Sequence, residues 1–472
     1  MPRHAMTAFV CALSLWVPIP GLTRENPEAG PAATKDQKKP VLPDLRTRKT
    51  GEDWPVFLGK NGDSKSSETG ILKTWPAAGP PRRWIKKLGT SYGMPTIALG
   101  RLFQLDRQGN LAHLICMKSE TGEKIWTSEY PTDYSDLYGY NNGPRASPTV
   151  DGGRVYTLGA EGVLRCVHTL DGKEVWQVDT SRKFNVMQNF FGVGTTPVVE
   201  GDLLIVMIGG SPPGSPPTIR RPSGNGSGIV AFNKHNGELV YKITDQLASY
   251  SSPVLRTIGE RRWGFVFARG GLVGFEPSSG KVDFEYPWRA RVIESVNASN
   301  PVVIGDQVFI SETYGPGSSL LKVKTGGYEL LWRDPERSRQ RAMQTHWNTS
   351  IYHEGYLYGS SGRHSGNAEL RCVELATGKV RWSVPGLSRS SLLYADGHFV
   401  CLSEYGELFL FRATPEKFLK VTSVTEPMMS QEGGGGRLLE YPAWAAPILS
   451  HGLLYLRGKN YLVCLELIPK KQ

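Results

Sequence analysis

Polar and aromatic side chains that could hold a ligand stand just ahead of a series of short apolar segments, or in the loops between them. The candidates for ligand binding are Tyr140, Asn142, Arg145, Asn189, Tyr250, Asn300, His346, Trp347, Asn348, Arg363, His364, Arg389 and Trp444, with Phe191 among them. Guanidinium groups bind anions and aromatic rings offer contact area, so this mixture is typical of a cleft for a polar or anionic ligand. The alternative, that these side chains only pack the loops, stays open.

Patterns of catalysis are missing from the sequence. It contains no P-loop, no H-E-x-x-H and no G-x-S-x-G. The oxygen-bearing side chains of Glu294, Asn297 and Asn300 stand close in sequence, but calcium requires a converging ligand set rather than sequence neighbours. The run Gly433–Gly436 lacks the strand–helix context of a phosphate loop. We therefore expect no catalytic residue, no metal and no cofactor.

A repeated unit is expected to position the candidate side chains. Each copy begins with a Ser/Thr/Asn-Pro step and runs through four short strands, which we call a to d. A TG, DG, NG or SG pair joins c to d, and an aromatic anchor follows four residues later. Residues 145–179 (RASPTVDGGRVYTLGAEGVLRCVHTLDGKEVWQVD) form a clear copy. A tight X-Gly turn between apolar runs suits a hairpin, and four short strands per unit at this period predict a β-propeller blade.

The copies number eight. The aromatic anchors are Trp84, Trp126, Trp176, Tyr241, Phe284, Trp332, Trp382 and Phe418. Strands a are expected to begin at positions 95, 148, 197, 253, 301, 350, 392 and 447. Trp84 has no strand a before it, and the last unit has no anchor after it. The segment around 83–88 should therefore complete the last blade and close the ring, which hides the open edges.

This unit resembles the tryptophan-docking repeat of the pyrroloquinoline quinone (PQQ)-type propellers over residues 53–467. That family includes quinoprotein alcohol dehydrogenases and the outer-membrane assembly lipoprotein BamB. The resemblance implies an all-β, eight-bladed propeller closed by an N-terminal strand. Resemblance to the dehydrogenases of this family would further imply PQQ and calcium as cofactors, with an adjacent cysteine disulfide and an aspartate base. The sequence has no Cys-Cys pair and no such aspartate, and Cys11 lies in no lipoprotein signal.

Three cysteines share one place in the repeat, ten residues before their anchors: Cys116, Cys166 and Cys372. Ala231 and Gly274 hold the same place in other copies, so it mostly asks for a small residue. Lys322 holds it before Trp332, so that blade should depart from the pattern. Cys464 lies in the matching strand of the last blade, and Cys401 lies in a strand b. We interpret these cysteines as small buried apolar residues.

Long insertions fall in two classes of connection. The b–c connection at 209–228 is long, and so are the d–a connections at 128–146, 179–195, 334–348 and 420–444. The a–b and c–d turns are short. In a propeller, the b–c and d–a connections emerge on one face, around the central channel. We therefore expect the ligand-binding candidates to surround that channel on the loop-rich face.

The N-terminus predicts export. Residues 1–23 contain an apolar run too short to span a bilayer comfortably and are predicted to be a signal peptide. Residues 24–52 are rich in Pro, Lys and Glu and are predicted to be a disordered linker. Residues 53–467 are expected to form the propeller and 468–472 a tail. The protein would be a monomer in the periplasm, cell envelope or extracellular space, and would touch membranes only peripherally.

The net charge of +11 comes without a nucleic-acid-binding motif, so we expect no nucleic-acid partner. The function that these observations favour is non-catalytic binding of a partner protein, a glycan or a small molecule on the loop-rich face. Two alternatives stay open: a PQQ-dependent alcohol or sugar dehydrogenase with a divergent site, and a BamB-like envelope assembly scaffold.

Overall fold

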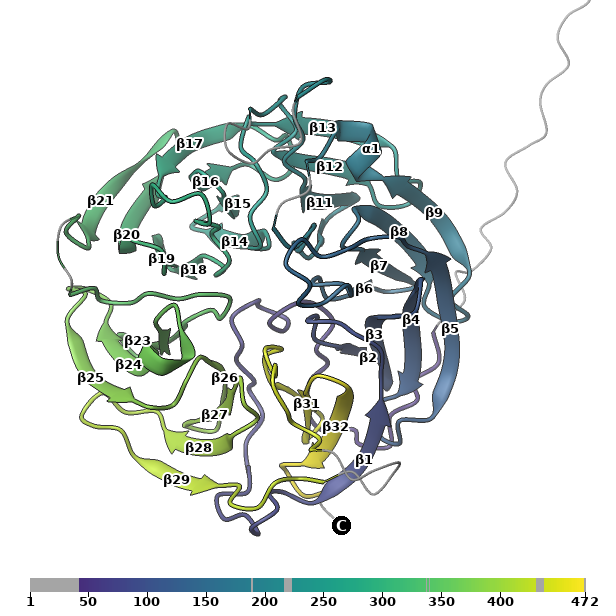
Figure 1. Cartoon of the computed structure of the whole chain (residues 1–472), viewed down its shortest axis with the longest axis vertical. Coiled ribbons are helices and arrows are strands. Elements are labelled where there is room, and N and C mark those ends of the chain that lie inside the picture. The colour runs from purple at the N-terminus through teal and green to yellow at the C-terminus, as the bar shows by residue number, and fades with distance from the viewer. Residues whose placement is uncertain are drawn as a thin grey trace, which may run out of the picture. The chain divides into compact units, whose positions relative to one another are not determined.

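Eight four-stranded antiparallel sheets surround a central axis in the computed structural model of the protein (Figure 1). The structure describes residues 42–187, 190–215, 223–336, 338, 340–429 and 437–470. The predicted all-β, eight-bladed propeller is confirmed. The predicted signal peptide lies outside the described residues.

The strands follow the chain order within each blade. Blades one to four comprise β2 (Thr96–Ala98), β3 (Arg101–Gln108), β4 (Leu111–Lys118) and β5 (Lys124–Pro131); β6 (Thr149–Asp151), β7 (Arg154–Leu158), β8 (Val163–His168) and β9 (Glu174–Asp179); β10 (Val198–Glu200), β11 (Leu203–Met207), β12 (Ile229–Asn233) and β13 (Leu239–Ile243); β14 (Val254–Ile258), β15 (Arg261–Ala268), β16 (Gly271–Phe275) and β17 (Val282–Pro287). A short helix, α1 (Thr180–Phe184), follows blade two.

Blades five to eight comprise β18 (Val302–Ile304), β19 (Gln307–Glu312), β20 (Gly317–Lys324) and β21 (Gly327–Arg333); β22 (Ile351–His353), β23 (Tyr356–Ser361), β24 (Glu369–Glu374) and β25 (Val380–Pro385); β26 (Ser390–Ala395), β27 (His398–Ser403), β28 (Leu408–Arg412) and β29 (Lys420–Ser423); β30 (Ile448–Ser450), β31 (Leu453–Arg457), β32 (Tyr461–Glu466) and β1 (Arg82–Lys87). A 3₁₀ turn, η1 (Ser365–Asn367), precedes β24.

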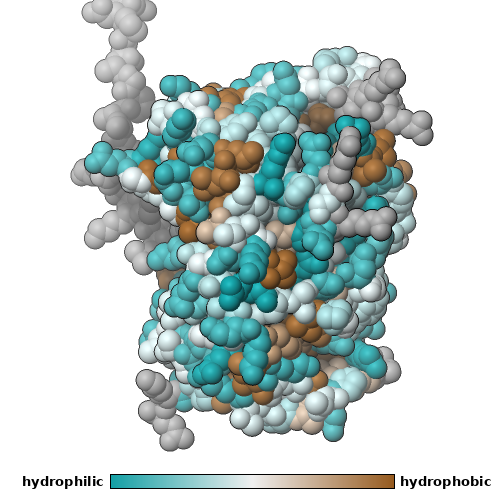
Figure 2. Space-filling view, turned by 90° about the vertical axis from the view of Figure 1, so that its left-hand side faces the viewer, coloured by the Kyte–Doolittle hydropathy of each residue, from teal (hydrophilic) through white to brown (hydrophobic). Residues whose placement is uncertain are grey.

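Burial explains the pattern of each blade. The middle strands b and c are apolar almost throughout, as in β11 and β27, because a neighbouring blade covers each of their faces. The outer strand d alternates, as in β5, because one of its faces meets water. The side wall of the molecule accordingly shows apolar side chains in small separate groups among hydrophilic ones (Figure 2).

Each tryptophan anchor docks on the next blade. The indole N–H groups of the anchors donate to backbone carbonyls in the following c–d turn, over 2.8 to 3.2 Å: Trp84 to Ser119, Trp126 to Thr169, Trp176 to Lys234, Trp332 to Leu375 and Trp382 to Thr414. The ring lies against the turn glycine. A Cβ added at Gly172, whose φ is +71°, would stand 2.5 Å from the Trp126 ring. The X-Gly pair therefore serves both its own hairpin and the neighbouring blade's tryptophan.

The small-residue place lies directly opposite the anchor. Cys116 faces Trp126, and Cys464 faces Trp84 across the closing pair. The prediction for blade five was wrong: Leu320, not Lys322, faces Trp332, because the β20–β21 hairpin is two residues longer. All five cysteines from Cys116 onward are free and buried.

Phe418 was wrongly taken as the anchor of blade seven. It precedes β29, and the strand position of the other anchors, just beyond the bulge, is held by Thr422, which faces Leu410. The ring of Phe418 instead packs 5.8 Å from the Trp382 ring. It therefore belongs to the turn that receives the preceding blade's tryptophan, the place that a glycine holds beneath Trp126.

The closing strand is confirmed. β1 pairs antiparallel with β32, so residues from the two ends of the propeller share one sheet. This pairing satisfies the backbone groups that an open ring would leave at blade eight.

The Ser/Thr/Asn-Pro step forms a chain of hydrogen bonds between blades. Each backbone N–H at this step donates to the side-chain oxygen at the same step of the next blade, over 2.8 to 3.1 Å, in the order Met94, Ser147, Thr196, Ser252, Asn300 and Thr349. These bonds hold the inner strands together around the axis. The recurring residue type is therefore explained by blade-to-blade contact rather than by ligand binding.

The predicted linker ends too late. Leu45 N–H donates to the Leu99 carbonyl over 3.1 Å, and the N–H groups of Thr47 and Arg48 donate to Glu120. Arg48 is buried and forms an ion pair with Glu466. Residues 42–52 thus pack on the propeller through hydrogen bonds and ion pairs, which a reading of apolar content does not detect.

Residues 54–66, which we call the strap, cross the channel at the a–b side. Trp54 bridges to Ile97, the Pro55 carbonyl accepts from Val150, and Ser66 and Ser64 exchange backbone hydrogen bonds with Tyr394. These partners lie on strands a of blades one, two and seven. The segment runs through the middle of the ring (Figure 1). It therefore closes one end of the channel.

Replacing Gly172 by alanine tests the docking. The added Cβ meets Trp126, so we expect it to destabilise the fold by about 1–3 kcal/mol more than Gly397→Ala does. Gly397 is the matched control: it also follows an aspartate, has a φ of +72° and has no atom within 4 Å of its Cβ position. Urea unfolding of both variants measures the difference. Equal costs would show that backbone strain alone accounts for the loss.

His451 makes stability pH-dependent. Burial lowers its pKa, but hydrogen bonds to Asp53 and to the Thr50 carbonyl outweigh burial, so the pKa is raised above 6.5. A raised histidine pKa contributes stability below pH 6.5 that is lost as pH rises through the folded-state value. We expect the unfolding free energies of the wild type and His451→Gln to converge as pH rises. A gap independent of pH would contradict this linkage.

Candidate functional site

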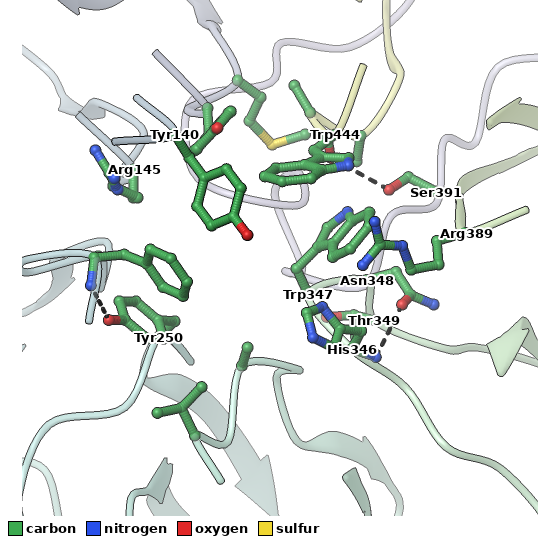
Figure 3. Close-up of a pocket in the computed structure, with 18 of the residues that line it drawn as sticks. Tyr140, Arg145, Tyr250, His346, Trp347, Asn348, Thr349, Arg389, Ser391 and Trp444 are labelled. Atoms are coloured by element: carbon green, nitrogen blue, oxygen red, sulfur yellow. Dashed lines mark hydrogen bonds between the residues drawn. The ribbon is translucent and has the colours of Figure 1, made fainter. Parts of the chain in front are cut away.

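A blind pocket of about 520 Å³ opens on the loop-rich face (Figure 3). Its walls come from the d–a and b–c connections, and its floor includes Phe57, Leu58 and Ser64 of the strap. The strap therefore makes the central channel into a pocket with one mouth. The sequence analysis placed the candidate residues on this face, but it did not predict that residues 54–66 form a floor beneath them.

Ten of the candidates line this one pocket: Tyr140, Arg145, Tyr250, His346, Trp347, Asn348, Arg363, His364, Arg389 and Trp444, as does Phe191. Asn142 does not line it, because its Oδ1 accepts from the Asp136 N–H and its carbonyl from Arg107, which shapes the loop. Asn300 belongs to the inter-blade chain of hydrogen bonds. Asn189 lies outside the described residues.

One wall is built on Arg389. Its guanidinium binds both oxygens of the buried Glu404, over 2.9 and 2.5 Å, and lies 4.3 Å from the centre of the Trp347 ring. Trp444 Nε1–H also donates to Glu404, over 3.2 Å. The two indole rings lie 4.6 Å apart, beside Arg389 (Figure 3). The charge of this arginine is therefore neutralised and its position fixed.

A second arginine is neutralised in the same way. Arg145 forms an ion pair with the buried Asp136, and its guanidinium lies 5.4 Å from the Tyr92 ring and 5.3 Å from the Tyr134 ring. The 132–146 connection thus folds around this pair. Cation–π contacts and a buried carboxylate hold the pocket wall rigid on this side.

His346 is a poor candidate for acid–base catalysis. Burial, and then the charges of Arg389, Arg363 and His364, lower its pKa to about 3. A base this weak holds no proton near neutral pH. His346 Nε2 shares a hydrogen bond of 3.2 Å with the Tyr314 hydroxyl, so it positions the tyrosine.

The exposed aromatic side chains gather at the mouth of this pocket. Among the described residues, four aromatic side chains are exposed: Tyr138 (52%), Tyr140 (65%), Tyr405 (50%) and Tyr441 (42%). Tyr441 stacks on Tyr405 at 5.1 Å and contacts Trp444 at 5.9 Å, while Tyr138 and Tyr140 both contact Phe191. The sequence analysis missed Tyr138, Tyr405 and Tyr441, because they stand within connections rather than just before a strand a. The aromatic content of the long d–a connections is the sequence signal that could have found Tyr138 and Tyr441.

The residues present do not fit a calcium–quinone site. Asn297 is fully buried and donates through Nδ2 to the carbonyls of Ala268 and Trp288, over 2.7 and 3.1 Å; it does not line the pocket that Glu294 lines. No group of three His, Cys, Asp or Glu side chains in the described part of the chain could hold a metal ion. Trp347 and Trp444 contact each other and leave no slot between their faces for a planar ring.

The buried cysteines offer no nucleophile. Burial raises the thiol pKa of Cys116, Cys166, Cys372 and Cys401 to about 12. Thiols, not thiolates, therefore predominate at neutral pH, as expected of apolar packing residues.

Comparisons with known proteins identify the family to which this propeller belongs. A family profile described as outer membrane protein assembly factor BamB matches residues 73–214 and 112–384. The chain belongs to this family. The crystal structure of BamB from Moraxella catarrhalis aligns with a TM-score of 0.53 and 10% identity, over 81% of this chain and 96% of that one. Quinohemoprotein alcohol dehydrogenase from Comamonas testosteroni aligns at 0.60 and 13%, over 89% and 81%.

At these identities the two structures establish a shared fold, which bears out the resemblance in the repeats. No curated protein sequence matches this BamB-family chain. Within its described residues, none of the helices has the length and apolar content needed to cross a membrane.

The Arg389–Glu404 pair offers a test of the site's construction. Glu404→Leu leaves a mostly buried guanidinium without its partner, so we expect a loss of about 3–5 kcal/mol in unfolding free energy. The double variant Arg389→Leu/Glu404→Leu should recover part of that loss, because neither charge remains. Denaturant unfolding measures both. The single variant Arg389→Leu is measured alongside them. If the double variant loses the sum of the two single losses, direct pairing is contradicted.

Proposed function

We propose that this protein is an exported, non-catalytic binding protein that takes a sugar ring of a glycan into the blind pocket. The observation that carries the proposal is the gathering of the exposed aromatic side chains around one pocket mouth. Monomeric surfaces rarely collect exposed rings without a partner, and these four tyrosines stand on the connections where a scaffold displays binding residues.

The chemistry of the wall favours a sugar over a purely apolar ligand. One face of a sugar ring is formed by C–H groups, which pack on aromatic rings such as those of Tyr140 and Trp444. Its edge carries hydroxyls, which need donors and acceptors such as Arg363, His364 and Glu294. A pocket lined by aromatic rings with a few polar groups combines the two requirements.

The size of the pocket favours a small ligand or a chain end over a folded partner. A volume of about 520 Å³ lies within the range of small-molecule sites and is too small for a protein element. The floor formed by Phe57 and Leu58 prevents a chain from threading through. A glycan would therefore insert its terminal ring and lay the following rings across the tyrosines of the mouth.

Titration with saccharides tests the proposal. Trp347 and Trp444 line the pocket, so their fluorescence should change when cellobiose, chitobiose or methyl β-D-glucuronide binds. We expect Tyr140→Ala to weaken binding of the responding saccharide roughly tenfold, about 1.4 kcal/mol. Leu170→Ala, which removes an exposed apolar side chain from a c–d turn on the other face, is the control. A wild-type protein that responds to none of these sugars would overturn the proposal.

The family match favours a second candidate, a role in outer membrane protein assembly. This role predicts that the protein co-purifies from envelopes with a β-barrel insertase. Its contacts would lie outside the pocket, so Tyr140→Ala should leave co-purification unchanged. Oxidation of alcohols or sugars after addition of PQQ and calcium would instead establish an enzyme, and the non-catalytic proposal would fail.

A further inference from the structure

We infer that the sugar ring taken by this pocket is acidic, and that Arg363 binds its carboxylate. The inference rests on the proposed function and names the ligand class of the same site. It follows from the distribution of charge over the pocket lining, from the fixed position of Arg363, and from the rings that surround it.

Among the residues that the structure describes, three arginines line the pocket, and one of the three lacks a carboxylate partner. Asp136 neutralises Arg145, and Glu404 neutralises Arg389. Arg363 forms no ion pair with any carboxylate in the described part of the chain. Its five N–H donors are therefore available, and a planar carboxylate is the acceptor whose geometry matches two of them at once.

Arg363 is held in place before any ligand arrives. Its guanidinium lies 4.5 Å from the centre of the Tyr314 ring, and its backbone carbonyl accepts from Arg389 Nη1–H over 3.1 Å. Tyr314 is fixed in turn by its hydrogen bond to His346. The Tyr314 ring thus lies beside the guanidinium, and no hydrogen bond from the Arg363 side chain to a described residue occupies its N–H groups. Such a preorganised donor loses little side-chain freedom on binding.

The surrounding charge favours an anion on this wall. Burial, and then the charges of Arg389, Arg363 and His364, lower the pKa of His346. Because Glu404 pairs with Arg389, Arg363 carries the uncompensated positive charge among the described arginines of this wall. Glu294 also lines the pocket and forms no ion pair among the described residues. Its negative charge opposes an acid, so it should set orientation by accepting from hydroxyls while the carboxylate meets Arg363.

A carboxylate attached to a sugar ring meets both requirements of the pocket wall: the carboxylate accepts hydrogen bonds from Arg363, and the C–H face of the sugar packs on the aromatic rings. Such rings occur in uronic acids and in sialic acids, which share this chemistry. Separate probes distinguish them: methyl β-D-glucuronide for the first, N-acetylneuraminate for the second, and benzoate for a carboxylate on a ring that is not a sugar.

The decisive experiment compares methyl β-D-glucuronide with methyl β-D-glucoside, which differ in the carboxylate alone, by calorimetric titration of the full chain. We expect the glucuronide, or N-acetylneuraminate in its place, to bind at least tenfold more tightly than the glucoside. Arg363→Gln should abolish this preference, because it weakens glucuronide binding far more than glucoside binding. Glu294→Gln should increase the preference severalfold, and raising the salt concentration should reduce it.

The outcomes separate this inference from the proposed function. If neither the glucuronide nor N-acetylneuraminate binds the wild type more tightly than the glucoside does, or if the preference survives Arg363→Gln, the inference is overturned and sugar binding is left intact. Failure of every sugar to bind overturns both. Benzoate binding as tightly as the acidic sugars, lost in Arg363→Gln, would retain the role of Arg363 and overturn the sugar. Arg363 is exposed, so an unchanged melting temperature of its variant confirms that the fold is retained.

Discussion

The docking of one blade's tryptophan on the next blade's turn glycine is the interaction on which the ring depends. It joins an apolar contact to a directed hydrogen bond, since the indole N–H donates to a carbonyl of the receiving turn. Because the receiving residue is a glycine, the ring can lie directly on the backbone, as Trp126 does on Gly172. Repeated around the axis, this contact joins each blade to the next, and the β1–β32 pair closes the ring. A second set of contacts, at the Ser/Thr/Asn-Pro steps, links blades near the axis. The outer and inner contacts together fix the angle between blades.

A rigid ring of this kind leaves its connections free to vary. The pocket is closed mostly by departures from the repeat: the d–a and b–c connections form most of the walls and the strap forms the floor, while Ser391 and Leu392 of β26 also line it. Two of the arginines that line the pocket are not free cations, because Asp136 and Glu404 are buried beside Arg145 and Arg389 and hold them against aromatic rings. Arg363 has no such carboxylate partner among the described residues. Arg145 and Arg389 therefore stabilise the wall, and the proposed contact with a carboxylate is assigned to Arg363.

The repeats made much of the fold predictable. Anchor spacing, X-Gly pairs and the offset between anchors and strands a are local patterns, and each repeated copy supports the others. Position along the unit also sufficed to assign Arg389, Trp347 and Trp444 to one face, because a connection's class decides the face on which it emerges. Prediction failed where a blade changed its hairpin length, as at Lys322, or lacked an anchor, as at Phe418. In both cases, counting residues assumed a register that only the pairing of strands sets.

By itself, the sequence determined the eight blades, the closing strand, the small buried cysteines and the face that carries the long connections, because all of these follow from short-range periodicity. The existence of the pocket and the residues that form it could be recognised only in the tertiary structure. The strap reaches strands a of blades one, two and seven through backbone hydrogen bonds, and Trp54 and Leu58 pack in the core; a short apolar run in the sequence does not tell which strands it will meet. The pairing of Arg389 with Glu404, the loss of Asn300 to the inter-blade contacts and the gathering of Tyr138, Tyr140, Tyr405 and Tyr441 all join residues from separate connections. Such contacts depend on how the connections fold over the channel, which the spacing of residues along the chain does not encode.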